Sequence, residues 1–163
     1  LHICVEMLRL RAAAAAALDQ VDALLVPTTA IPPRPVDVLD GTPELPSHHE
    51  FAEGMLLTRS NILWFYAHYM NQPEDVLDPR FSPILAEDLT GLAPTLLIVA
   101  GHDPLRDEGI AYAERLKSAG IKVDLSNYAG MVHGFLSFAD AVDQGKKAIE
   151  EVADALRKVF AQT

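Results

Sequence analysis

The hydrophobic and polar positions along the chain switch several times between two periodicities. Apolar residues at helical spacing predict helices over residues 3–18, 58–70, 107–119 and 139–160. Compact apolar runs, or alternation of apolar and polar residues, predict strands over residues 21–26, 95–100 and 121–128. This order predicts the α/β class, with a mainly parallel sheet flanked by helices, because parallel strands need helical crossovers. The pattern indicates a single domain over residues 1–163.

The segment from Pro27 to Glu50 breaks this pattern. Its six prolines predict extended or turn backbone and exclude a helix: Pro27, Pro32, Pro33, Pro35, Pro43 and Pro46. We interpret the segment as a long surface excursion over the carboxyl edge of the sheet. Segments of this length are typical of lids, binding loops or disorder. Residues 71–94 are also loop-rich, with one short helical turn.

Two of the predicted helices have faces of different character. Thr58 is the expected N-cap of the helix over residues 58–70. That helix carries a broad apolar and aromatic face, made of Ile62, Leu63, Phe65, Tyr66 and Tyr69. The face either packs on the sheet or partly lines a hydrophobic substrate pocket, and the pattern leaves both interpretations open. In the last helix, an apolar stripe is expected to face the core, with Lys146, Lys147, Glu150 and Glu151 opposite.

Composition narrows the classes of partner. The net charge of −10 disfavours nucleic acid and anionic membranes as partners. The sequence holds no apolar run of about 18 residues, the length expected of a membrane span. Its single cysteine, Cys4, rules out an intrachain disulfide and a thiolate metal cluster, and is typical of a reducing, cytoplasmic compartment. The chain begins with Leu1, which suggests that it starts inside a longer reading frame or was cut.

Candidate chemistry lies at the ends of two consecutive predicted strands. Asp103 follows the strand over residues 95–100, and His133 lies just past the strand over residues 121–128. Taken alone, Asp103 fits a helix N-cap, and a single histidine has no necessary catalytic duty. Together, a carboxylate and an imidazole at one sheet edge can form the orienting acid and the proton-transferring base of a Ser-His-Asp device.

Two stretches carry a family resemblance. FAEGMLLTRSNILWFYAHYM and DPRFSPILAEDLTGLAPTLLIVAGHDPLRDEGIAYAERLKSAGIKVDLSNYAGMVHGF resemble the C-terminal half of the hormone-sensitive-lipase-like esterases, which are α/β-hydrolases acting on carboxylic esters. The resemblance implies a partial α/β-hydrolase fold, Asp103 as the acid, His133 as the base and a small-molecule ester as substrate. Met55, Leu56 and Trp64 match a segment that shapes the substrate pocket. The resemblance implies neither a metal nor an organic cofactor.

The chain departs from this family at the nucleophile. The family's G-D-S-A-G-G elbow and HGGG loop do not occur in residues 1–163. None of the six serines has a G-x-S-x-G context: Ser47, Ser60, Ser82, Ser118, Ser126 and Ser137. Cys4 lacks an elbow glycine and is a poor substitute. The N-terminal half with the nucleophile elbow is therefore absent from this sequence, and no residue is assigned as the nucleophile.

Two functions stay open at this point. The chain descends from ester hydrolases with a Ser-His-Asp mechanism but is inactive alone, or it is a truncated or fusion fragment that acts only as an oligomerising or complementing half. A half sheet exposes a strand edge, which predicts a homo-oligomer or a complementing chain. In full-length relatives the strand before the histidine and the last helix often form a dimer contact, so residues 121–127 and 142–160 are the candidate surfaces.

Residues 1–40 allow two accounts of their origin. In the first, the helix and strand match the esterase helix after the elbow and the next strand. In the second, residues 7–35 resemble the C-terminal part of amidase-signature enzymes, through the run RAAAAAALDQVDALLVPTTAIPPRP. The second account predicts a junction between two gene fragments near residues 35–46.

Overall fold

The structure, a computed structural model, describes residues 45–161. At its centre are two parallel strands, β1 (Thr95–His102) and β2 (Val123–Val132), paired from Thr95 with Val123 to Ala100 with Tyr128. Helix α4 (Arg106–Ser118) connects them. The predicted helix over 3–18, strand over 21–26 and most of the proline-rich segment lie outside the described residues.

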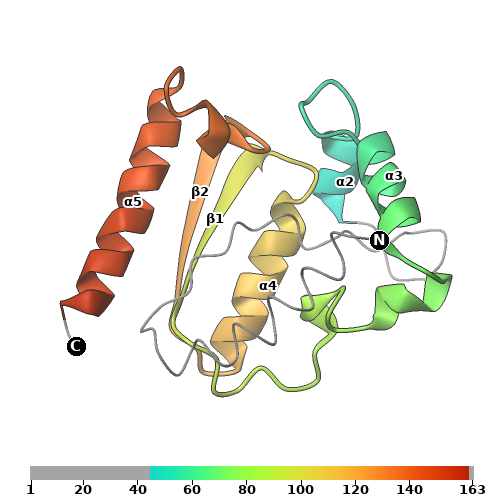
Figure 1. Cartoon of the computed structure of the whole chain (residues 1–163), viewed down its shortest axis with the longest axis horizontal. Helices are drawn as coiled ribbons and strands as arrows, with labels where there is room; N and C mark the ends of the chain where they lie inside the picture. The colour runs from blue at the N-terminus through green and yellow to red at the C-terminus, as the bar shows by residue number, and fades with distance from the viewer. Residues whose placement is uncertain (1–44, 162–163) are drawn as a thin grey trace.

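Helices cover both faces of this strand pair, with α4 on one side and α5 (Asp143–Phe160) on the other (Figure 1). On the α4 face the backbone of Gly109 lies against the side chain of Val99, where a Cβ would come within 2.7 Å of Cγ1. On the α5 face the small side chains of Ala100 and Ala148 are buried together with Phe135. The consecutive residues Val99 and Ala100 of β1 therefore point to opposite helices, as the two-residue period of a strand requires. This arrangement confirms the predicted α/β class.

A second core lies under α3 (Arg59–Tyr69), whose N-terminus is capped by Thr58 as predicted, with the Asn61 N–H 3.2 Å from the Thr58 hydroxyl. Ile62 and Tyr66 are its buried residues. They form a cluster with four buried residues from the segments around α3: Leu57, Val76, Phe81 and Leu105. None of these six belongs to β1 or β2. Within residues 45–161, the buried face of α3 therefore packs on loops and on the start of α4, and not on the strand pair, as one interpretation had predicted.

Several short elements complete the described chain. They are α2 (Pro46–Glu50), η2 (Pro73–Leu77), η3 (Pro83–Leu85) and η4 (Phe135–Phe138), of which the η elements are 3₁₀ turns. The prediction that the proline-rich segment excludes a helix is wrong at its end. Pro46 occupies the first turn of α2, where a missing N–H costs nothing and the fixed φ favours the helix.

The boundaries of several predicted elements are also wrong. β1 runs on to His102, two residues beyond the expected end at Ala100. β2 runs on to Val132, beyond the expected end at Tyr128. The last helix begins at Asp143 instead of Ala139, because residues after η4 form a turn and Val142 has extended backbone, with φ −128° and ψ 115°.

Candidate active site

The backbone of the turn after β1 holds the carboxylate of Asp103 in place. β1 ends at His102, and Asp103 is only 7% exposed. Its Oδ1 accepts the N–H of Leu105 at 2.9 Å, and its carbonyl accepts the N–H of Arg106 at 3.0 Å. Oδ2 is the oxygen left to face the neighbouring strand end. The N-cap interpretation of Asp103 is wrong, because the N-cap of α4 is Leu105. The Asp103 side chain instead accepts the N–H of Leu105 through Oδ1 and keeps Oδ2 for another partner.

His133 is brought to that oxygen by the strand register. His102 pairs with Val132, so Asp103 and His133 are the next residues after a matched pair on parallel strands. His133 Nδ1 lies 2.8 Å from Asp103 Oδ2. Gly134 then turns the chain away with φ +71°, a left-handed conformation that glycine adopts without a steric penalty.

An irregularity in the strand pairing makes this register possible. The pairing shifts between Ala100 and His102, where β2 has two more residues than β1 between the paired positions. Gly101 faces this irregularity, and any Cβ at that position would collide with the backbone of Ala129. Such irregularities often redirect side chains next to active sites. Here the extra residues bring His133 level with Asp103.

The geometry fixes the protonation pattern of the imidazole. An ionised carboxylate only accepts hydrogen bonds, so the hydrogen on the bond to Asp103 belongs to Nδ1 of His133. In the neutral ring, Nε2 is then the nitrogen free of hydrogen and able to accept a proton. The His133 side chain is 32% exposed against 10% for Asp103, so the imidazole is the more accessible member of the pair.

A charged network surrounds the turn that carries Asp103. Arg106 donates to Asp107 at 2.8 Å, to the carbonyl of Gly101 at 3.0 Å and to Glu50 at 3.3 Å. Partial burial opposes ionisation of Asp107, but hydrogen bonds from Arg106 and from the backbone of Ser47 outweigh it and hold the pKa of Asp107 below its usual range. Hydrogen bonds therefore connect the turn both to β1, through Gly101, and to α2, through Ser47 and Glu50.

The structure brings the predicted acid and base together, but it leaves the predicted pocket residues on the surface of their segments. Leu56 is 58% exposed and Trp64 is 57% exposed, while Met55 is half-buried. The indole of Trp64 lies against the ring of His68, with centroids 4.1 Å apart. The role of these three residues in a substrate pocket stays a prediction.

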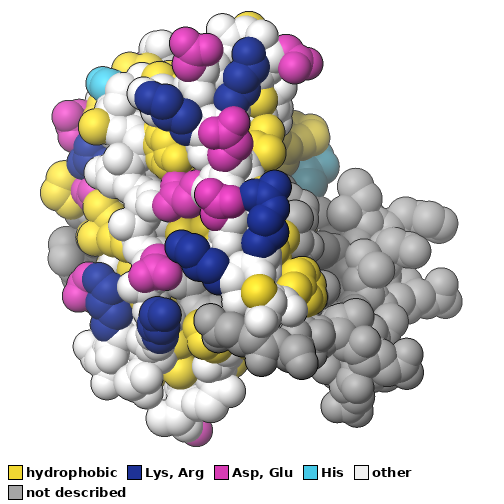
Figure 2. All heavy atoms as spheres, turned by 90° about the vertical axis from the view of Figure 1, so that its left-hand side faces the viewer, with side chains coloured by type: hydrophobic (Ala, Val, Ile, Leu, Met, Phe, Trp, Pro, Cys, Tyr) yellow, Lys and Arg dark blue, Asp and Glu magenta, His cyan; other side chains and the backbone are white. Residues whose placement is uncertain are grey.

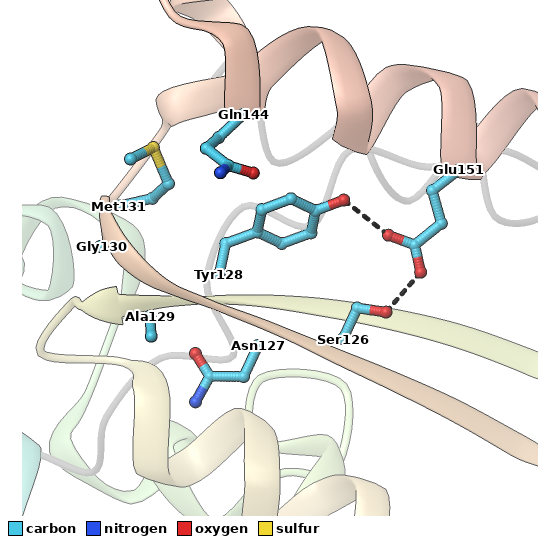
Figure 3. A pocket seen from close by; sticks show the side chains of 8 residues that line it. All are labelled: Ser126, Asn127, Tyr128, Ala129, Gly130, Met131, Gln144 and Glu151. Atoms are coloured by element: carbon cyan, nitrogen blue, oxygen red, sulfur yellow. Dashed lines mark hydrogen bonds between the residues drawn. The ribbon is translucent and has the colours of Figure 1, made fainter.

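A different hollow, of about 500 Å³, lies between β2 and α5 (Figure 3). Glu151 points from α5 toward the sheet and accepts hydrogen bonds from Ser126 and, at 2.7 Å, from the hydroxyl of Tyr128. The prediction that Glu151 belongs to the solvent-facing side of the helix is therefore wrong. Burial and the hydrogen bond to Glu151 raise the pKa of Tyr128 to about 12.

The raised pKa of Tyr128 predicts a loss of stability at alkaline pH. In the unfolded chain this tyrosine titrates near a pKa of about 10. From there to about 12 the unfolded state gives up a proton that the folded state keeps, so the stabilisation is complete below pH 10 and is lost as the pH rises through 12. We expect the difference in thermal midpoint between the wild type and Tyr128→Phe to shrink over this range. A constant difference would contradict the prediction, and Tyr69→Phe, on an exposed tyrosine of α3, is the control.

Among residues 45–161, no group of three or more His, Cys, Asp or Glu side chains is arranged to hold a metal ion. In the same part of the chain, no helix is long and apolar enough to cross a membrane.

The layered helices and strands, with a carboxylate and an imidazole paired at the carboxyl ends of parallel strands, define an α/β-hydrolase. A family model described as alpha/beta hydrolase fold matches residues 8–137. The chain therefore belongs to the alpha/beta hydrolase fold family, in a lineage of carboxylic ester hydrolases.

Individual relatives agree with this assignment. The carboxylic ester hydrolase LipN of Mycobacterium tuberculosis is 44% identical over 119 residues, which are 72% of this chain and 32% of LipN. The ethyl acetate hydrolase of Pseudomonas putida is 36% identical over 121 residues, covering 74% of this chain and 38% of that enzyme. An esterase structure from Pyrobaculum calidifontis matches with a TM-score of 0.69 and 37% sequence identity. The match covers 74% of this chain and 39% of the Pyrobaculum chain. The chain thus spans about a third of the length of the curated relatives it matches.

The family match also bears on the first 40 residues. It begins at residue 8 and runs through most of the predicted helix over 3–18 and all of the predicted strand over 21–26. This extent favours the esterase account of those segments, and the comparisons give no support to the amidase resemblance of residues 7–35. The junction near residues 35–46 stays a prediction.

Proposed function

We propose that the chain supplies the acid and the base of a serine-type hydrolase for small carboxylic esters. The observation that carries this proposal is the 2.8 Å hydrogen bond between Asp103 Oδ2 and His133 Nδ1. It joins a buried carboxylate to a more exposed imidazole, which is the arrangement needed to orient a base. The ester-hydrolase relatives support the choice of substrate class.

The two residues have different duties in this mechanism. His133, through Nε2, takes the proton of a serine hydroxyl as that oxygen attacks the ester carbonyl, and then gives the proton to the leaving alcohol. Asp103 keeps the imidazole in the required tautomer and stabilises the imidazolium that forms. Met55, Leu56 and Trp64 are proposed as part of the apolar wall that receives the acyl or alcohol group. We also propose that the protein acts in the cytoplasm.

The nucleophile is proposed to come from outside the 163 residues. None of the six serines has the G-x-S-x-G context of an elbow, and no HGGG loop is present to stabilise an oxyanion. Acid and base alone offer little ester hydrolysis. Activity therefore requires a serine-bearing segment that completes the sheet, whether from a second chain or from a longer form of this one.

A second candidate function is that of a non-catalytic half that oligomerises or complements another chain. The outward side of α5 favours it, since Ile149, Val159 and Phe160 are 47%, 41% and 52% exposed. Figure 2 shows hydrophobic side chains lying between charged ones on the side of the molecule that carries α5. A homo-oligomer through α5 and the preceding strand is the proposed form of such an assembly.

One assay separates the two candidates. The chain is tested on p-nitrophenyl acetate and butyrate, alone and co-expressed with the part of the Pseudomonas putida ethyl acetate hydrolase that it does not cover. We expect hydrolysis only in the co-expressed sample, and we expect His133→Ala or Asp103→Ala to abolish it. Activity that survives both substitutions would refute the assigned roles. If no sample is active and light scattering shows a stable oligomer of the chain, the non-catalytic candidate is favoured.

A further inference from the structure

The helix that follows Asp103 has an unusual start. The first N–H groups of a helix have no partner within the helix and need one from elsewhere. At the start of α4, Asp103 satisfies the N–H groups of Leu105 and Arg106. Leu105 occupies the N-cap position but has no side-chain oxygen, so it makes no capping bond. The next N–H in line, that of Asp107, must find its acceptor outside the turn.

Ser47 of α2 provides that acceptor. Its side chain is completely buried, and its Oγ lies 3.2 Å from the Asp107 N–H nitrogen and 2.7 Å from the carbonyl oxygen of Pro104, to which it donates. In return, the backbone N–H of Ser47 donates to the Asp107 carboxylate at 2.9 Å. Three hydrogen bonds thus join Ser47 of α2 to Pro104 and Asp107, in the backbone that directly follows Asp103. Ser47 caps α4 from a different segment of the chain.

We propose that Ser47 is a positioning residue for the Asp103–His133 pair. Asp103 has no bond of its own to α2, but its Oδ1 is fixed by the N–H of Leu105, and Leu105 directly follows the carbonyl of Pro104 that Ser47 holds. Ser47 therefore acts on the carboxylate through the backbone of residues 104–107. The catalytic meaning of this positioning rests on the proposed function, whereas the effect on the hydrogen bond to His133 does not.

Other contacts dock the same short helix on the same turn. Arg106 bonds to Glu50 at 3.3 Å and lies over the ring of Phe51 at 5.0 Å, and that ring meets His102 edge-on at 5.4 Å. Each of these contacts is between a residue of α2 or its C-cap and a residue adjacent to the Asp103 turn. These contacts hold α2 against the turn, and within this interface the Ser47 hydroxyl is the group that caps α4.

The chain offers a matched control in Ser82. Ser82 is also completely buried, and its Oγ donates at 2.7 Å to a backbone carbonyl, that of Val76. That bond fixes the loop between η2 and η3, not the turn after β1. Ser47→Ala and Ser82→Ala therefore remove similar buried hydrogen bonds, but only the first removes hydrogen bonds to the backbone that follows Asp103.

Proton NMR detects the Asp103–His133 hydrogen bond directly. A proton shared between an imidazole and a carboxylate gives a strongly downfield signal in the proton NMR spectrum, and Asp103→Ala assigns that signal in the full 163-residue chain. We expect Ser47→Ala to broaden or remove the signal below its own thermal transition, and Ser82→Ala to leave it intact. In the co-expressed ester hydrolase we expect Ser47→Ala to lower kcat by about 10²-fold with little change in KM, as a slight misplacement of a catalytic group does.

Each outcome decides the proposal independently of whether the chain is an esterase. An intact signal in Ser47→Ala, or equal loss in both serine variants, overturns the positioning role even if hydrolysis is observed. Loss in Ser47→Ala alone supports it even if no hydrolysis is found. If Ser47→Ala does not fold, Ser47→Cys takes its place, because the thiol has nearly the same shape but is a weak donor and acceptor. A normal signal in Ser47→Cys would then count against the proposal.

Discussion

Asp103→Asn is expected to lower kcat for p-nitrophenyl butyrate by about 10⁴-fold in the co-expressed hydrolase, the size of effect seen when an orienting carboxylate becomes an amide. The asparagine keeps the shape of the side chain, and its oxygen can still accept the N–H of Leu105. Its amide NH₂ then faces Nδ1 of His133 and donates to it. The imidazole proton moves to Nε2, which can no longer accept a proton from a serine.

This prediction separates orientation from folding and from binding. KM is expected to change little, because the carboxylate faces the imidazole and not the substrate. The control is Asp154→Asn on α5, where an exposed carboxylate pairs with Arg157. This variant also removes one negative charge, but outside the Asp103–His133 pair. Steady-state kinetics of both variants, with thermal midpoints measured in parallel, make the comparison. A kcat for Asp103→Asn within tenfold of the wild type would show that the pair is not the acid and base of the reaction.

The contact between Asp103 and His133 was predictable because the two residues follow consecutive strands. Parallel strands end at the same sheet edge, so residues after each strand are brought together without any knowledge of the connecting helix. The register that places Asp103 level with His133 was not predictable. The predicted strand stopped at Tyr128, and the irregularity over residues 129–131 has no periodic signature in the sequence.

Long-range side-chain bonds account for most of what the sequence did not show. Ser47 lies in a proline-rich segment predicted to have no helix, and its partners Pro104 and Asp107 are 57 and 60 residues away. Glu151 fits the charged side of an amphipathic helix, yet it binds Ser126 and Tyr128, 25 and 23 residues earlier in the chain. Periodicity assigns such residues to solvent because it counts polarity and not partners. A serine and a tyrosine two residues apart on one strand face were the available hint.

The aromatic helix shows a different limit of the pattern. Composition indicated one broad face on α3, but the structure buries Ile62 and Tyr66 and leaves Trp64, Phe65 and Tyr69 at 57%, 55% and 40% exposure. Hydrophobicity alone could not rank these residues, because Tyr66 and Tyr69 are chemically identical. Both rings lie against Phe81, and what separates them is that Tyr66 belongs to the buried cluster that includes Leu105, whereas Tyr69 does not.

The second large effect is expected at Leu116, the bulkiest of the side chains that are less than 2% exposed. Leu116→Ala removes most of a buried side chain on α4 and leaves a cavity, which costs about 3 kcal/mol of unfolding free energy, within the usual range for such changes. For a chain of this length that corresponds to a fall of roughly 9 °C in the thermal midpoint. Leu92→Ala, at a residue 46% exposed in the loop before β1, is expected to change stability by less than about 0.5 kcal/mol.

Leu116→Ala also tests whether the Asp103–His133 hydrogen bond depends on the overall stability of the domain or on the turn after β1. It lies near the C-terminal end of α4, whereas Asp103 and the Ser47 bonds lie at the other end of that helix. Below its transition, Leu116→Ala should therefore keep the downfield signal of the Asp103–His133 bond while losing much of the unfolding free energy. Urea denaturation gives the second quantity and the NMR spectrum the first. If Leu116→Ala loses the downfield signal as well as the unfolding free energy, the Asp103–His133 hydrogen bond depends on the packing of the whole domain. A loss of unfolding free energy below about 1 kcal/mol would contradict the assignment of Leu116 to the core.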